Sequence, residues 1–110
     1  GSICPVNMVK RVEREMFMKV SSEYGFTEAS PGMTATRWDD SFEVRCHTVG
    51  KAFEHTEVKV LDKDGNECAV GEEGELCNRG YNNMLGYYKD EKSTKEILDD
   101  QGFLHTGDLG

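Results

Sequence analysis

The chain has 110 residues, of which 36% are hydrophobic and 31% charged, a composition typical of one folded domain with a modest core rather than of a disordered chain. Its 21 acidic and 13 basic side chains give a net charge of −8, which argues against a nucleic-acid backbone or an anionic membrane as its partner. No apolar run approaches the roughly 20 residues of a membrane-spanning helix, and no secretory signal pattern opens the chain, so we predict no transmembrane segment.

The four cysteines, at positions 4, 46, 68 and 77, include no C-x-x-C pair. An even number permits disulfides, but single cysteines within apolar or strand-like stretches are typical of reduced thiols. We therefore predict a cytoplasmic location. The spacing of Cys46, His47 and His55 fits no zinc pattern, so no zinc site is predicted there.

An amphipathic helix is predicted for residues 5–16, because apolar side chains recur at helical spacing and proline is favourable at the first helical position. Its apolar stripe, which we expect to lie in the core, consists of Val6, Val9, Val12 and Met16. Residues 17–22 predict a short buried strand after this helix. A helix followed at once by a strand is typical of one edge of an α/β sheet.

The loop after this strand combines residue types that suit a nucleotide. In open α/β sheets, ligands bind just beyond the carboxyl ends of strands. Gly25 lets the backbone turn or approach a ligand closely, and Tyr24 can stack on a base. Thr27 can donate to a phosphate oxygen, and Glu28 can bind Mg²⁺. An ordinary capped loop is the alternative, since such short motifs are frequent by chance.

The middle of the chain predicts small strands separated by glycine-containing turns. Residues 33–44 show no clear period and suggest an exposed connection. Short or alternating β-like segments follow at 49–53, 57–61, 67–70 and 75–79, with turns at 62–66 and 71–74. Strands of this kind favour a small barrel or sandwich.

Residues 62–73 also resemble part of a calcium-binding loop. Asp62, Asp64, Asn66 and Glu73 occupy its first, third, fifth and twelfth positions. The sixth position, however, is Glu67 instead of glycine, and the flanks alternate like strands. A hairpin is predicted instead of a calcium site.

Near the end of the chain, Asp90 predicts the N-cap of a helix that runs to about Leu98, and Gly102 ends this helical region. Asp108 stands between two glycines, where a short carboxylate could accept both hydroxyls of a ribose. A simple turn aspartate is the alternative, and the more frequent one for this residue alone. No role is assigned to His105.

Three stretches together resemble the adenylate-forming superfamily, which includes acyl-CoA synthetases, luciferases and the adenylation domains of peptide synthetases. They are Tyr24-Gly25-Phe26-Thr27-Glu28, then Gly74-Glu75-Leu76-Cys77-Asn78-Arg79-Gly80 with Gly86-Tyr87-Tyr88, and finally His105-Thr106-Gly107-Asp108. Residues 79–88, together with Glu28-Ala29-Ser30-Pro31, look most like the fatty acyl-CoA synthetase branch.

The resemblance implies a two-step ligase. A carboxylic acid, here a fatty acid, reacts with ATP to give an acyl-adenylate, and coenzyme A then displaces AMP. Tyr24 matches the aromatic residue packed on adenine, Thr27 the hydroxyl at the α-phosphate, and Asp108 the carboxylate that holds the ribose. Glu28 matches the ligand of Mg²⁺, and Gly25 would line the passage between acyl group and nucleotide.

Two further groups of residues are implied less directly. Gly1, Ser2 and Ile3 fall where the family has a small-residue loop against adenine and the acyl group. An acyl tunnel is expected near Ala29, Ser30 and Gly32, without a firm assignment.

The resemblance also implies the fold. An α+β, mainly β chain is expected: residues 1–31 form a helix–strand edge of the large AMP-binding domain, and residues 32–110 a small distorted antiparallel β-barrel subdomain with one short helix. The family's phosphate loop, hinge and C-terminal lysine have no counterpart here, so we expect a segment of a larger enzyme that is inactive alone. Its uncovered apolar surface and strand edge favour self-association.

Two other functions stay open from the sequence. The chain could be a non-catalytic acidic β-barrel module that binds a nucleotide or a protein. Within the superfamily, an aryl-acid ligase or a peptide-synthetase adenylation domain is also compatible with these motifs.

Overall fold

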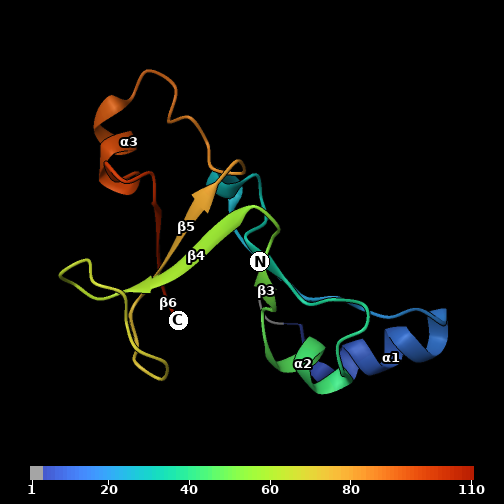
Figure 1. Cartoon of the computed structure of the whole chain (residues 1–110). Helices are drawn as coiled ribbons and strands as arrows, with labels where there is room; N and C mark the ends of the chain where they lie inside the picture. Colours follow the sequence, from blue (N-terminus) through green and yellow to red (C-terminus); the bar gives the residue numbers. More distant parts are fainter. Residues whose placement is uncertain (1–3) are drawn as a thin grey trace.

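The computed structural model describes residues 4–110, which form an elongated molecule with two small antiparallel sheets (Figure 1). The elements are, in chain order, α1 (Val6–Met16), β1 (Glu23–Tyr24), the 3₁₀ turn η1 (Thr27–Ala29), β2 (Thr34–Ala35), α2 (Phe42–His47), β3 (Lys51–Ala52), β4 (Thr56–Leu61), β5 (Glu75–Gly80), α3 (Glu91–Ile97) and β6 (Leu104–Leu109). Among these residues, no helix is long and apolar enough to cross a membrane.

The first sheet is short and its strand order is β1-β2-β3, whereas the second has longer strands in the order β4-β5-β6. All neighbouring strands are antiparallel, and β4 pairs with β5 along its whole length. The expected α+β, mainly β class is confirmed. Within residues 4–110, however, both sheets are open, and the strands do not close into the expected barrel.

Helix α1 confirms the predicted helix, with Pro5 as its extended N-cap residue. Of the predicted stripe, Val9 is buried, Val6 and Val12 are half-buried, and Met16 is exposed. The helix ends because Phe17 adopts the left-handed conformation (φ 53°), which leaves its side chain 94% exposed.

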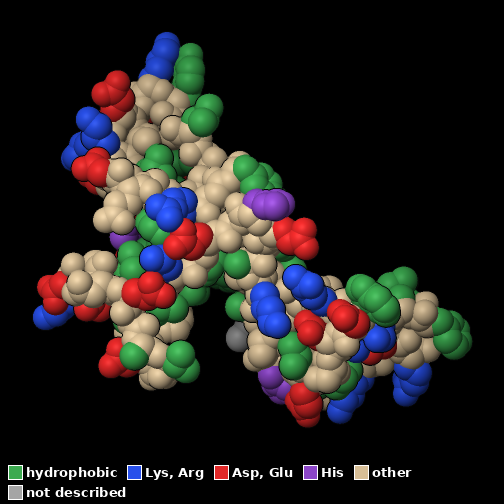
Figure 2. Space-filling model, in the orientation of Figure 1, with side chains coloured by type: hydrophobic (Ala, Val, Ile, Leu, Met, Phe, Trp, Pro, Cys, Tyr) green, Lys and Arg blue, Asp and Glu red, His purple; other side chains and the backbone are tan. Residues whose placement is uncertain are grey.

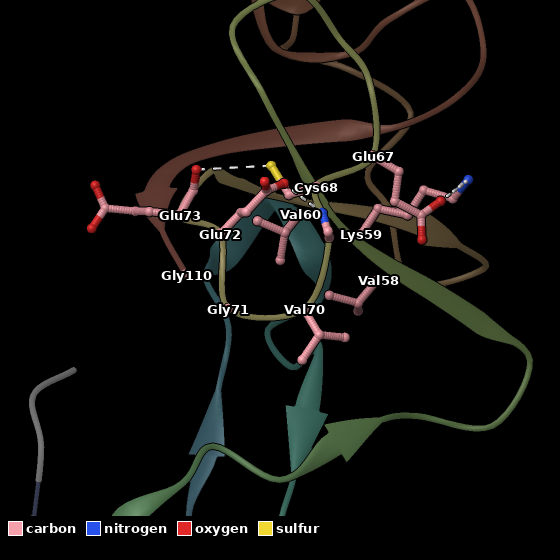
Figure 3. Close-up of a pocket in the computed structure, with 11 residues that line it drawn as sticks. Val58, Lys59, Val60, Glu67, Cys68, Val70, Gly71, Glu72, Glu73 and Gly110 are labelled. Carbon is pink, nitrogen blue, oxygen red and sulfur yellow. Dashed lines mark hydrogen bonds and ion pairs between the residues drawn. The ribbon is translucent and has the colours of Figure 1, made fainter.

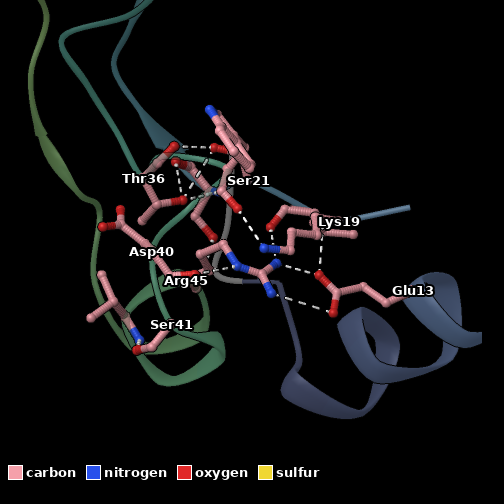
Figure 4. A network of polar contacts seen from close by, with 11 residues as sticks. Glu13, Lys19, Ser21, Thr36, Asp40, Ser41 and Arg45 are labelled. Carbon is pink, nitrogen blue, oxygen red and sulfur yellow. Dashed lines mark hydrogen bonds and ion pairs between the residues drawn. The ribbon is translucent and has the colours of Figure 1, made fainter. Parts of the chain in front are cut away.

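The strand predicted for residues 17–22 is wrong, and side chains from α1 and α2 bind the backbone of this segment at Val20 (Figure 4). The Val20 N–H donates to Glu13 (2.8 Å), and the Val20 carbonyl accepts from Arg45 (2.8 Å). Arg45 is buried and pairs with Glu13, so that α1, α2 and this segment meet at one ion pair. The first strand begins only at Glu23.

The region 33–44, expected to be an irregular connection, contains β2 and the start of α2. Ser41 caps α2, because its side chain accepts a hydrogen bond from the Val44 N–H (3.3 Å). Helix α3 confirms the predicted helix, and Asp90 caps it in the same way through Ser93 (3.0 Å). Strand β6, at the end of the chain, was not predicted.

The main apolar cluster lies between the two sheets. It contains the buried residues Ala29, Met33 and Leu104, and Tyr24, Phe26, Val58, Met84, Ile97 and Leu98 pack against it. Ala29 ends η1, whereas Leu104 begins β6. This cluster therefore fixes the 24–29 loop against the C-terminal strand.

Candidate functional site

Tyr24 and Asp108 lie together, although they are 84 residues apart. The Tyr24 hydroxyl donates to a carboxylate oxygen of Asp108 at 2.7 Å. Tyr24 ends β1 in the first sheet, whereas Asp108 belongs to β6 in the second. Burial, and secondarily this hydrogen bond, raise the pKa of the Tyr24 phenol. The structure thus joins the residue predicted to contact adenine and the residue predicted to hold ribose.

An irregularity between β5 and β6 shapes the backbone at Asp108. The register shifts between Glu75 and Cys77, and Gly107 has a φ of +73°, which favours glycine. The Glu75 carboxylate accepts from the Gly107 N–H (2.8 Å), and the Asp108 N–H donates to the Thr106 hydroxyl (3.0 Å). Glu75 is therefore part of the support of Asp108, which the sequence did not show.

Thr27 and Glu28 lie on η1, three and four residues after Tyr24. The buried Ala29 anchors this turn, and Ser30 closes it in the left-handed conformation with a bond from its N–H to the Thr27 carbonyl (3.1 Å). Thr27 is exposed and Glu28 is half-buried. The loop expected to follow a strand is thus a one-turn helix that presents a hydroxyl and a carboxylate.

Glycine is required at position 25 because residues 31–32 of the same chain pack directly against its Cα atom. A Cβ atom at this position would lie 2.0 Å from the Pro31 carbonyl oxygen and 2.7 Å from the Gly32 Cα atom. The close approach expected of Gly25 is therefore made to residues 31–32. Of the residues expected near an acyl tunnel, Ala29 and Gly32 are buried and Ser30 is exposed.

A second loop, residues 80–88, contacts η1. The Tyr87 hydroxyl donates to one carboxylate oxygen of Glu28 (2.7 Å), and the Met84 N–H donates to the Glu28 carbonyl (2.7 Å). The hydrogen bond to Glu28 also raises the pKa of the Tyr87 phenol. The glycine and tyrosines of this loop were noted in the sequence, but their proximity to Glu28 was not.

His105 lies on β6 between two carboxylates. Its Nδ1 is 2.8 Å from Glu75, and its Nε2 is 3.5 Å from Asp99. The hydrogen bond with Glu75 raises the pKa of His105. No role was predicted for His105, and the structure shows it as a hydrogen-bonded side chain, with Glu75 30 residues away in the sequence.

Glu75, Cys77 and His105 also bring potential metal-ligating atoms within 4.8 Å of one another. Burial raises the pKa of the Cys77 thiol to about 12. The Nδ1 atom of His105 lies 3.4 Å from the Cys77 sulfur and 2.8 Å from Glu75, so these side chains link β5 and β6.

A separate hollow of about 490 Å³ lies between β4 and the loop 67–73 (Figure 3). Its walls include Val60, Val70, Glu72 and Gly110. Among residues 4–110, none of those predicted from the sequence to bind nucleotide lines this hollow, so we do not include it in the candidate site. Gly1, Ser2 and Ile3, predicted to lie near adenine, are outside the described residues.

Comparisons with known proteins identify the family of the chain. Residues 1–88 match the family of AMP-binding enzymes. The chain is 48% identical over 111 residues to YngI of Bacillus subtilis (strain 168), whose name describes it provisionally as an acyl-CoA synthetase. It is 38% identical over 106 residues to a long-chain-fatty-acid–CoA ligase of Salmonella typhimurium.

These two alignments cover 99% and 92% of the chain but only 20% and 18% of the relatives. Among solved structures, apo MatB from Rhodopseudomonas palustris superposes with a TM-score of 0.86 and 28% identity. That superposition covers all of the chain and 22% of MatB.

Proposed function

Because the chain belongs to the family of AMP-binding enzymes, we propose that it is a segment of an ATP-dependent, AMP-forming acyl-CoA ligase. The chain spans about a fifth of the length of the curated relatives that it matches. In this proposal the remaining parts of the reaction machinery belong to the rest of a larger enzyme. We also propose that residues 1–31 belong to its large domain and residues 32–110 to its β subdomain, with the first sheet joining the two.

The contact between Tyr24 and Asp108 carries this proposal. It places an aromatic ring beside a carboxylate that has only one oxygen engaged by the phenol. An adenine could stack on the ring of Tyr24, while the ribose hydroxyls donate to Asp108. Adenosine needs both interactions at adjacent positions, and this edge of the molecule offers them.

Glu28 fits a magnesium ion by its chemistry. One carboxylate oxygen accepts from Tyr87, and the other has no hydrogen-bond partner within residues 4–110. Mg²⁺ in nucleotide sites is commonly held by one or two carboxylates together with substrate phosphates. The bound ion would neutralise charge on the phosphates of ATP.

The proposed reaction has two steps. The carboxylate oxygen of the acid forms a bond to the α-phosphorus of ATP, and the bond to the pyrophosphate oxygen breaks, giving acyl-AMP and pyrophosphate. The sulfur of coenzyme A then loses its proton to solvent and forms a bond to the acyl carbon. The bond between this carbon and the phosphate oxygen breaks, and AMP leaves with that oxygen. Thr27, exposed on η1, would donate to an α-phosphate oxygen, and Asp108 would hold the ribose.

We propose a fatty acid as the acid, on the basis of the similarity to a long-chain-fatty-acid–CoA ligase.

We also propose a cytoplasmic location. All four cysteines lie in the described part of the chain and are free thiols, which fits a reducing compartment.

The test is acid-dependent exchange of pyrophosphate into ATP by the full-length enzyme, with fatty acids of several lengths and an aromatic acid compared. Glu28→Gln should lower this exchange by about 100-fold or more, because it removes the negative charge that binds the ion. An enzyme that binds AMP but shows no exchange with any acid would favour the non-catalytic module. The 110-residue chain alone should show no exchange.

A further inference from the structure

We propose that Tyr87 is a positioning residue that orients the Glu28 carboxylate for the magnesium ion. This inference rests on the proposed function, because it takes Glu28 as the residue that binds the ion. Tyr87 itself would touch neither ATP nor the acid. It would act through the hydrogen bond that its hydroxyl donates to Glu28 at 2.7 Å.

The loop 80–88 holds Glu28 at two points. Tyr87 binds one oxygen of the carboxylate, and the Met84 N–H binds the carbonyl of the same residue at 2.7 Å. Asn82, which is buried, also donates from its amide to the Gly32 carbonyl at 2.7 Å. The loop therefore holds both the main chain and the side chain of Glu28, and its Asn82 also holds the segment that follows η1.

Tyr87 is itself held in place by a hydrogen bond to α3. Its N–H donates to the Thr94 hydroxyl (2.9 Å), and that hydroxyl donates to the Asp90 carbonyl (2.8 Å). Gly86 has a φ of +145°, and a Cβ atom there would lie 2.9 Å from the Thr94 side chain. A chain of contacts thus runs from the helix cap through Thr94 and Tyr87 to Glu28.

Tyr87 also determines which oxygen of the Glu28 carboxylate is available to a metal ion. A glutamate side chain on an exposed turn samples several rotamers, and fixing one costs entropy when a ligand binds. Tyr87 engages one oxygen and leaves the other without a partner among residues 4–110. Groups that hydrogen-bond a metal ligand in this way commonly change metal affinity by about 10- to 100-fold when they are removed.

Tyr88 provides a matched control. It is the next residue in the chain and 86% exposed, and its hydroxyl has no hydrogen-bond partner in the described part of the chain. Tyr87→Phe and Tyr88→Phe each remove one oxygen and keep the aromatic ring. Only the first substitution removes the contact with Glu28.

The experiment measures Mn²⁺ binding to the full-length enzyme by electron paramagnetic resonance, in the presence of α,β-methylene-ATP. We expect about tenfold weaker Mn²⁺ binding for Tyr87→Phe, a smaller weakening for Thr94→Val, and wild-type binding for Tyr88→Phe. AMP affinity measured in EDTA should be unchanged in all three variants, because Tyr24 and Asp108 are intact.

Glu28→Gln separates the two proposals. If it weakens Mn²⁺ binding while Tyr87→Phe binds Mn²⁺ as tightly as the wild type or more tightly, the positioning role is overturned and the proposed function stands. If Glu28→Gln binds Mn²⁺ normally, Glu28 is not the metal ligand, and both proposals about it fail. Loss of AMP affinity in Tyr87→Phe would also overturn the inference, because it would indicate a general structural role.

Discussion

The Tyr24 hydroxyl donates a hydrogen bond of 2.7 Å to Asp108, and this bond joins the two sheets of the molecule. The phenol and the carboxylate come from different sheets and face each other at this point. The second oxygen of Asp108 has no hydrogen-bond partner within residues 4–110.

Asp108→Ala in the full-length enzyme should weaken AMP binding by about 10- to 100-fold, because hydrogen bonds to a charged group are each worth about 1.5–3 kcal/mol. Tyr24→Phe should weaken it only about threefold, since the ring remains to stack on adenine and the lost hydrogen bond runs to Asp108 and not to the nucleotide. Isothermal titration calorimetry with AMP measures both. Equal losses in the two variants would argue that Asp108 does not bind the ribose directly.

Gly25→Ala should disrupt the 24–29 loop, because the new Cβ atom would lie 2.0 Å from the Pro31 carbonyl oxygen. We expect a loss of stability of about 2 kcal/mol or more, as for other severe overpacking, together with loss of AMP binding. Thermal unfolding and calorimetry of the full-length variant measure the two effects.

The control is Gly65→Asn in the turn after β4. Gly65 also has a positive φ (+81°), but nothing lies within 4 Å of its added Cβ, and asparagine tolerates this conformation. Normal behaviour of Gly25→Ala would show that the loop can move away from Pro31 without consequence.

His105 should make stability depend on pH. Its pKa in the folded protein is raised above its ordinary value of 6.5, chiefly by the hydrogen bond with Glu75. The protonated imidazole therefore stabilises the fold fully below about pH 6.5, and this stabilisation is lost as the pH rises through the folded pKa. Melting temperatures of the full-length wild type and His105→Asn should differ most near pH 6 and converge toward pH 9.

A difference between wild type and His105→Asn that grows with rising pH would contradict the assignment, because it would mean that the neutral imidazole is the stabilising form. Glu75→Gln offers a further comparison. It removes the negative charge beside His105, so the pKa of His105 should be raised less. The melting temperature should then depend less on pH, as in His105→Asn.

The isolated 110-residue chain should self-associate through the surface at the end of α1. This apolar end consists of Met16, Phe17 and Met18, which are each about half or more exposed. Figure 2 shows hydrophobic side chains gathered over the end of α1. Phe17→Asn should shift sedimentation velocity profiles toward the monomer, since asparagine also suits the left-handed conformation.

Val70→Asn is the matched control for this surface. Val70 is fully exposed and lies on the loop 67–73 beside β4 (Figure 3). Figure 1 shows this loop on the opposite side of the molecule from α1. A monomeric wild-type chain, or an equal effect of both substitutions, would contradict self-association through the α1 surface.

The elements predicted correctly are those whose signals are local. Helix α1 has apolar side chains at helical spacing, strand β4 alternates, and Asp90 marks the start of α3. Strands β1 and β2 have two residues each and exist only because they pair with neighbouring strands, so no periodicity could reveal them. The equally short β3 lies within the β-like segment predicted at 49–53. Ser41 before α2 was a usable cap signal, but the helix of six residues is too short to show a period.

The same distinction applies to the site. Tyr24, Thr27, Glu28 and Asp108 came from short motifs and a family resemblance, and the structure shows that Tyr24 meets Asp108. The partners that support them could not be found in this way. Tyr87 is 59 residues from Glu28 and His105 is 30 from Glu75, and such contacts follow from tertiary packing alone.

The division into two sheets has a thermodynamic consequence. Tyr24 belongs to one sheet and Asp108 to the other, so a nucleotide that contacts both would act as a non-covalent cross-link between them. Binding would then raise the free energy of unfolding in proportion to the logarithm of nucleotide concentration above Kd. The two sheets, which the Tyr24–Asp108 hydrogen bond and a small apolar cluster already join, would melt as one cooperative unit when the nucleotide is bound.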